Sequence, residues 1–184
     1  FAAADAIEST AAIQAGTVYF GALDGHLYAL DLHSGALKWQ YKASDEIKSS
    51  PLVAHGTVYF GDEKGDFHAV DAQSGKRRWL FSAGAAITSS ANIAGDRLVF
   101  GSYDQNLYCL AAQDGAQIWQ IATEGYIHST PAVFGDAVVV AGCDGYLRLV
   151  GLQSGAEQKR LELGTYVAAS VAVSGQRAYV GTFG

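Results

Sequence analysis

The chain repeats itself every 40 residues along its whole length of 184 residues. The clearest copy covers residues 29–39. It returns at residues 69–79 and 109–119 and, in weaker form, at residues 149–159, and no insertion interrupts the register. A fixed period of this length indicates a stacked array, because each repeat is one small unit that buries its apolar face against its neighbours.

Each repeat consists of short β-prone runs separated by turn residues. In the second repeat the expected strands are residues 49–54, 57–61, 66–71 and 77–81. The turns at residues 56, 64–65 and 74–75 each contain a glycine. The apolar residues show no i, i+3, i+4 spacing, which argues against helical repeats of similar length. Four strands in about 40 residues are typical of a β-propeller blade.

The sequence therefore predicts an all-β fold, a β-propeller built from four-stranded antiparallel blades. We expect four complete blades at residues 7–46, 47–86, 87–126 and 127–166, with a partial blade at 167–184 and another at the amino-terminal end. We interpret residues 1–184 as a single propeller segment, an arc of a larger ring of seven or eight blades. Because a propeller removes its open sheet edges by closing, we expect such an arc to bind further blades or to self-associate through these edges.

Composition excludes several classes of function. The net charge is −6, from 12 basic and 18 acidic residues scattered along the chain, so there is no basic stripe for nucleic acid. The apolar runs are far shorter than the roughly 20 residues of a membrane-spanning helix. The two cysteines, Cys109 and Cys143, occupy different positions in their repeats and predict no disulfide framework. We interpret Cys109 as a small buried apolar residue.

The repeated pattern Ala-x-Asp-x-x-x-Gly-x-x-x-Trp resembles the tryptophan-docking motif of pyrroloquinoline-quinone-type (PQQ-like) propeller repeats. The matching residues are Ala29, Asp31, Gly35 and Trp39 in the first copy, Ala69, Asp71, Gly75 and Trp79 in the second, and Gly115 and Trp119 in the third. The fourth copy retains only Gly155 and has Lys159 at the tryptophan position. The resemblance covers essentially the whole chain.

The motif suggests a structural role for the tryptophans. We expect each indole to lie flat between neighbouring blades, on backbone and on small side chains such as Ala29, where it would bury on the order of 200 Å². Stacking on a quinone is a poor alternative, because these residues recur on the outer strand of each blade and a cofactor would lie on the axis. Lys159 could pack only through its aliphatic stem, so we expect the fourth blade to be the loosest.

The resemblance implies two classes of function. One is a non-catalytic scaffold that binds another protein or a ligand; its relatives include the lipoprotein of the bacterial outer-membrane barrel-assembly machinery and sensor domains fused to kinases. The alternative is a segment of a PQQ-dependent oxidoreductase acting on alcohols or sugars, in which PQQ and calcium would bind. Such enzymes carry adjacent cysteines, which this chain lacks, and Asn92 and Asn106 fall in no calcium-ligand pattern. We therefore favour the scaffold and expect no catalytic residue, cofactor or metal. The resemblance alone suggests a periplasmic or other extracytoplasmic location.

One set of loop positions differs from repeat to repeat although the scaffold around it stays constant. The aligned residues at the start of the first strand are Glu8, Lys48, Thr88, His128 and Ala168. We expect them at the mouth of the central channel, and variation on a symmetric scaffold is a common way to build a site. The prediction is that Lys48, Tyr126, His128 and Tyr166 contact a ligand or a peptide; the alternative is that they are ordinary loop residues.

The remaining polar residues favour turns and surfaces. Asp24, Asp104 and Asp144 fit tight-turn chemistry. Asp62, Glu63 and Asp66 form an acidic loop that could hold a cation, although a solvated turn is the favoured interpretation. The histidines His26, His33, His55 and His68 occupy unrelated repeat positions without metal-ligand spacing and are expected at the surface.

Overall fold

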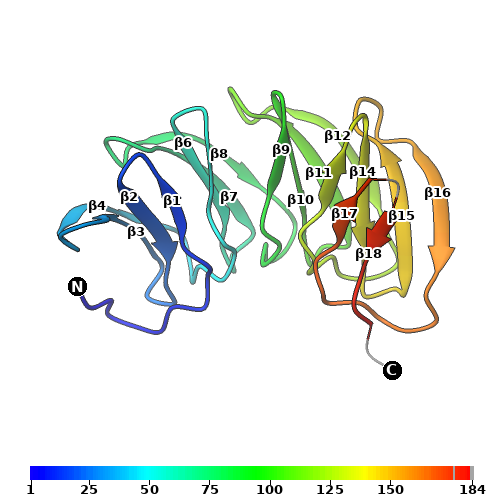
Figure 1. Ribbon diagram of the computed structural model, residues 1–184, viewed down its shortest axis with the longest axis horizontal. Helices are drawn as coiled ribbons and strands as arrows, with labels where there is room; N and C mark the ends of the chain where they lie inside the picture. Colours follow the sequence, from blue (N-terminus) through cyan, green and yellow to red (C-terminus); the bar gives the residue numbers. More distant parts are fainter. Residues whose placement is uncertain (176, 183–184) are drawn as a thin grey trace. The chain divides into compact units, whose positions relative to one another are not determined.

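The computed structural model describes residues 1–175 and 177–182, and every regular element in this part of the chain is a β-strand (Figure 1). The chain divides into two compact units, Phe1–Ser90 and Ala91–Gly184, which are described separately. No helix long and apolar enough to cross a membrane occurs among the described residues.

The strands of the first unit are β1 (Ala12–Gln14), β2 (Thr17–Gly21), β3 (His26–Asp31), β4 (Leu37–Lys42), β5 (Leu52–Ala54), β6 (Thr57–Gly61), β7 (Asp66–Asp71) and β8 (Arg77–Ser82). Those of the second unit are β9 (Asn92–Ala94), β10 (Arg97–Gly101), β11 (Asn106–Ala111), β12 (Gln117–Ala122), β13 (Ala132–Phe134), β14 (Ala137–Ala141), β15 (Tyr146–Gly151), β16 (Glu157–Glu162), β17 (Ala172–Ser174) and β18 (Arg177–Tyr179).

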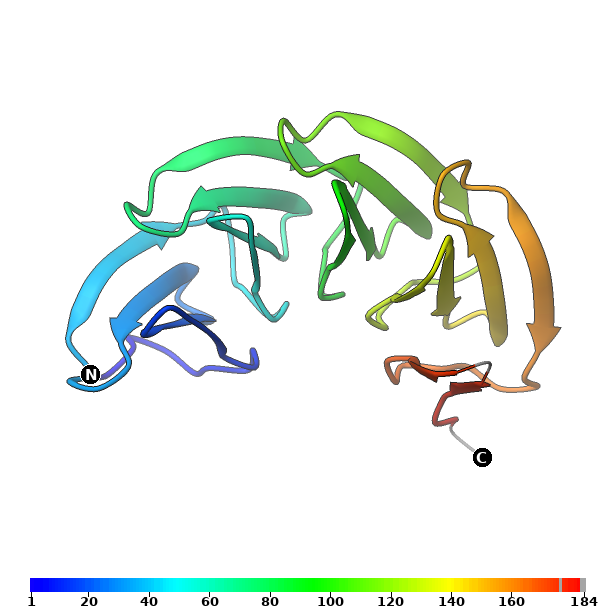
Figure 2. The same cartoon turned by 45° about the horizontal axis from the view of Figure 1, so that its top comes forward.

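Each repeat forms one antiparallel sheet whose strands follow each other in chain order. The first unit contains the sheets β1–β4 and β5–β8; the second contains β9–β12, β13–β16 and the two-stranded sheet β17–β18. Within each unit the short first strands of successive sheets lie next to one another, as β1 and β5 do (Figure 2). The prediction of a β-propeller with four-stranded antiparallel blades is confirmed.

The first strand of the second sheet is shorter than predicted, because serine side chains replace part of its backbone pairing. The Ser49 hydroxyl donates to the Gly61 carbonyl (2.7 Å) and accepts from the Gly61 N–H (2.8 Å), so regular pairing begins only at Leu52. The next serine joins neighbouring repeats: the Ser50 N–H donates to the hydroxyl of Ser90 (2.9 Å). These small polar side chains tie the short inner strands together where bulkier residues would not fit.

Trp39 and Trp119 each pack on the next repeat of their own unit. The indole N–H of Trp39 donates to the Ala72 carbonyl (3.1 Å), and a Cβ added to Gly75 would lie 2.8 Å from the Trp39 ring. Trp119 does the same with the Leu152 carbonyl (2.8 Å). The motif glycine thus has two roles, since Gly75 has a positive φ of 70° in its turn and also provides the surface on which the indole lies.

The motif aspartate holds the turn that precedes the outer strand. In the first repeat, Asp31 accepts hydrogen bonds from the backbone N–H and the hydroxyl of Ser34 (2.9 Å each), and these bonds lower the pKa of its carboxyl group. Asp71 accepts the same bonds from Ser74 and also pairs with Arg78 at 2.7 Å. The Arg78 guanidinium is the main cause of the lowered pKa of Asp71.

The second unit contains the two cysteines and the position where lysine replaces tryptophan. Cys109 is fully buried and burial raises the pKa of its thiol to about 11, which confirms it as a small apolar core residue. Lys159 lines a hollow of about 520 Å³ whose walls include Leu149 and Val173.

Candidate protein-binding surface

Three aromatic side chains of the second unit form a surface cluster, here called the Tyr103 cluster: half-buried Tyr103 with exposed Tyr126 and His128. The rings of Tyr103 and Tyr126 stack with their centroids 5.1 Å apart and their planes 13° apart. The Tyr103 hydroxyl lies 3.0 Å from Nδ1 of His128, at hydrogen-bonding distance. Tyr126 is 50% exposed and His128 is also exposed, so the cluster presents ring surface to solvent.

The core of the second unit positions two members of this cluster. Tyr126 and His128 flank Ile127, which is buried against Gly101. The Ile127 N–H donates to the Ser102 carbonyl (3.2 Å), which fixes the extended backbone at this point. Because successive residues of an extended segment point to opposite sides, burying Ile127 directs both of its neighbours outward.

The β10–β11 turn positions the third member. Tyr103 precedes Asp104, whose carboxylate accepts the N–H of Asn106 (3.0 Å) and the hydroxyl of Tyr108 (2.6 Å). This turn chemistry was predicted for Asp104, and it holds the preceding residue at the surface. Burial, and then the bond to Asp104, raise the pKa of Tyr108, so its phenol remains a donor to the carboxylate.

Tyr166 lies in the same unit and borders a second feature. It is half exposed and lines a hollow of about 180 Å³ together with Cys143 and Asp144. The Cys143 N–H donates to the backbone carbonyl of Tyr126 (2.9 Å), so the segment that carries Tyr126 adjoins a residue of this hollow. Of the four predicted site residues, the structure therefore links Tyr126 and His128 through Tyr103, and places Tyr166 beside a residue bonded to Tyr126.

Lys48 belongs to the first unit, where its surroundings are ionic. Its ammonium group lies 3.3 Å from Glu63 and 3.5 Å from Glu46. The hydrogen bond from Lys48 to Glu63 is the largest cause of the raised pKa of the amine. Lys48 is therefore surrounded by Glu46 and Glu63. The position of Glu63 is occupied one repeat further on by Tyr103, and that of Glu46 two repeats further on by Tyr126; the rings of these two tyrosines stack.

Sequence reasoning missed Tyr103. Its position follows the end of the second strand, and the aligned residues in the other repeats are Leu23, Glu63 and Cys143. The residues aligned with Tyr103 differ between repeats as strongly as those aligned with His128. That variation is the sequence signal that could have identified Tyr103. The stacking with Tyr126 could not be predicted, because the two residues are 23 positions apart and meet only through the fold.

Two expectations about the second repeat are wrong. His68 is almost completely buried, and the carboxylates of Asp62 and Asp66 are buried as well, so they do not form a solvated turn. The reason is that this turn is covered by residues of the first sheet: Tyr41 of β4 and Ser44, which follows β4, both bond to the group. The repeat spacing alone did not reveal that cover.

Comparison with known proteins reveals similarity along the whole chain. The sequence profile of a family described as outer membrane protein assembly factor BamB matches residues 3–102 and 64–184. Two solved structures are similar over 95% of this chain: BamB from Moraxella catarrhalis (TM-score 0.83, 22% identity) and the computationally designed Ika8 protein (TM-score 0.82, 17% identity). The chain spans 54% and 55% of those chains, about half their length, and this likeness shows the fold. No curated protein sequence matches it.

Proposed function

The chain belongs to the family of the outer membrane protein assembly factor BamB, and on this basis we propose that it is a non-catalytic propeller scaffold that binds another protein through the Tyr103 cluster. The observation that carries the proposal is the stack of half-buried Tyr103 and exposed Tyr126, with exposed His128 beside it. Tyrosines combine a large apolar face with a hydroxyl and lose little entropy on binding, which makes them frequent anchors of protein interfaces.

The proposal extends to the surroundings of the cluster. Glu124, close in sequence to Tyr126, is strongly exposed, with an Arg160 nitrogen 3.6 Å from its carboxylate. A stacked aromatic surface with a charged rim matches the usual anatomy of a transient interface, in which anchors lie at the centre and polar groups around them. Tyr166 would extend the contact, whereas the part predicted for Lys48 stays a prediction. A family of outer membrane assembly factors also supports an extracytoplasmic location.

Peptide binding tests the proposal. A phage-displayed library of random peptides would be panned against the purified protein, and the dissociation constants of the selected peptides measured. We expect Tyr126→Ala to weaken binding at least tenfold, since loss of an interface anchor costs about 2 kcal/mol or more. Tyr179→Ala is the matched control, because this tyrosine of the same unit is equally exposed (52% against 50%). Unchanged affinity in Tyr126→Ala, or failure to enrich any peptide, would contradict the proposal.

The proposal assigns no PQQ or calcium to this chain, and an assay distinguishes it from the oxidoreductase alternative. With both added, we expect ethanol or glucose to reduce an electron-accepting dye no faster than in the absence of the protein. The reason is that the chain lacks the adjacent cysteines of the quinone-dependent enzymes it resembles. Dye reduction that depends on PQQ and on the protein would favour the alternative.

A further inference from the structure

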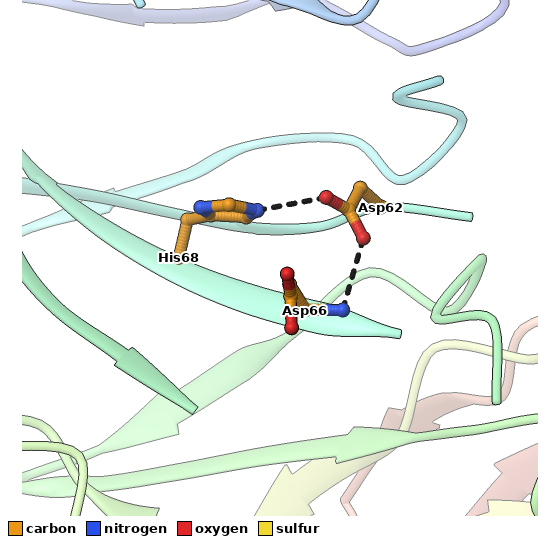
Figure 3. A group of neighbouring side chains, drawn as sticks. All are labelled: Asp62, Asp66 and His68. Atoms are coloured by element: carbon orange, nitrogen blue, oxygen red, sulfur yellow. Dashed lines mark hydrogen bonds and ion pairs between the residues drawn. The ribbon is translucent and has the colours of Figure 1, made fainter. Parts of the chain in front are cut away.

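A buried group of two carboxylates and one imidazole lies inside the first unit. Asp62 follows β6, while Asp66 and His68 alternate on β7 and so point to the same side of that strand (Figure 3). One potential ligand atom from each residue lies within 4.8 Å of the other two. The three residues are 0%, 6% and 1% exposed, which makes this a site in the interior and not a surface cluster of acids.

The charge of this group is not balanced by the protein. Among the described residues, no lysine or arginine forms an ion pair with Asp62 or Asp66. The imidazole of His68 lies 2.9 Å from Asp62, and Lys64 acts on Asp66 only from beyond ion-pair distance. Even a protonated imidazole would leave one negative charge in the interior. Buried charges are costly unless they are paired or bind a metal, and a divalent cation would balance the two carboxylates.

The other repeats show that the fold itself does not need this arrangement. In each of the other three repeats one turn aspartate bonds to the side chain four residues further on: Asp24 to the Tyr28 hydroxyl (2.6 Å), Asp104 to the Tyr108 hydroxyl (2.6 Å) and Asp144 to Arg148. In the second repeat that aspartate position is Lys64, its partner position is His68, and two carboxylates are supplied from new positions, Asp62 and Asp66. One repeat has therefore exchanged a single carboxylate with its tyrosine or arginine partner for a set of three side chains typical of metal ligands.

Hydrogen bonds from neighbouring residues already orient two of these side chains, Asp66 and His68. The hydroxyls of Ser44 and Ser82 each donate to Asp66 at 2.6 Å. Hydrogen bonds donated to a carboxylate favour its charged form, which is the form that binds a metal ion. Nδ1 of His68 lies 3.1 Å from the Tyr41 hydroxyl. Ligating histidines almost always carry such a bond on their second nitrogen.

We propose that Asp62, Asp66 and His68 bind a divalent transition-metal ion of the zinc type, with Nε2 of His68 and one oxygen from each carboxylate as ligands. Imidazole and carboxylate are both suitable ligands for Zn²⁺. Nε2 of His68 then no longer hydrogen-bonds to Asp62, and the imidazole carries its proton on Nδ1, directed at Tyr41. The ring of Phe60, stacked on the imidazole at 4.8 Å, shields the site from one face. The ion fastens β4 of one sheet, through Tyr41, to β7 of the next.

The test uses tag-free protein stripped of metal and refolded with or without Zn²⁺, because the ligands are buried. We expect one Zn²⁺ per chain to survive gel filtration, and the melting temperature to rise with the concentration of added Zn²⁺. The matched variant is D62S/K64D/H68Y, which gives the second repeat the residues that the third repeat has at these positions (Ser102, Asp104 and Tyr108). This variant should fold, but its affinity for Zn²⁺ should be lower by roughly a hundredfold or more. Replacing a residue that only hydrogen-bonds to a ligand would lower the affinity less.

A second variant keeps the test decisive if the first fails to fold. Asp66→Asn removes one ligand charge, and asparagine is natural at this position in the third repeat (Asn106). It too should weaken Zn²⁺ binding. The exposed histidines, such as His33 and His55, remain in all three proteins and account for non-specific binding. Wild-type protein that retains no Zn²⁺, or variants that bind it as tightly as the wild type, would overturn the proposal.

Discussion

Replacing Trp119 with alanine is expected to lower the free energy of unfolding by about 3–5 kcal/mol, the usual cost of truncating a large buried aromatic. Trp119 is only 8% exposed and belongs to a core cluster with Val138 and Val150 of the next sheet. Its indole N–H donates to the Leu152 carbonyl (2.8 Å), and a Cβ on Gly155 would come within 2.9 Å of the ring. Alanine would leave a cavity between the two sheets together with a carbonyl that has lost its donor.

Denaturant unfolding followed by circular dichroism measures this loss. For a chain of this size the melting temperature should fall by roughly 2–4 °C per kcal/mol. Ile118→Ala is the matched control: this residue precedes Trp119 on β12, but its side chain is more than one-third exposed, and we expect a loss below about 1 kcal/mol. A loss for Trp119→Ala no larger than that of Ile118→Ala would show that the indole does not hold the sheets together.

The fold could be predicted because its signals are local and repeated. Short apolar runs separated by glycine turns indicate strands, and their recurrence every 40 residues indicates identical units that stack. The strand at residues 57–61 has the predicted bounds, since both its composition and its flanking turns are visible in the sequence. Strand β5 begins three residues late because the Ser49 hydroxyl bonds to Gly61, and a side chain taking the place of a backbone partner leaves no trace in the pattern.

The candidate sites were harder to predict because they depend on contacts between repeats. The variation of residues 48, 126, 128 and 166 indicated where a site could lie, but Tyr103 entered only through its ring contact with Tyr126. The sequence predicts His68 at the surface, because this residue and three other histidines occupy unrelated repeat positions without metal-ligand spacing. In the structure it is stacked on Phe60 and covered by Tyr41 of the preceding sheet. Burial of this kind is decided by a neighbouring repeat.

One contact between neighbouring sheets recurs from repeat to repeat, so the residues that form it can be compared between repeats of the same chain. A glycine at the end of the second strand lies against an isoleucine at the start of the next repeat; the pairs are Gly21 with Ile47, Gly61 with Ile87 and Gly101 with Ile127. A Cβ on Gly101 would lie 2.1 Å from Cγ2 of Ile127 and 2.8 Å from its backbone oxygen. In the fourth repeat the pair is Ala141 with Val167, and both residues belong to one core cluster. A larger residue on one side accompanies a smaller residue on the other.

Gly101→Ala is therefore expected to lower the free energy of unfolding by about 3 kcal/mol, the upper part of the range for overpacking, because a backbone atom as well as a side chain stands in the way. Ile127→Val alone should cost about 0.5–1.5 kcal/mol through lost packing. The double variant reproduces the Ala–Val pair of the fourth repeat, and the smaller side chain leaves room to move away from the new methyl group. We expect the double variant to be more stable than Gly101→Ala alone.

Urea unfolding of the wild type and the three variants gives the coupling energy between the two substitutions, which should exceed about 0.5 kcal/mol in the favourable direction. Losses that simply add would mean that alanine and valine at residues 141 and 167 are unrelated substitutions and that each sheet accommodates its own side chain independently.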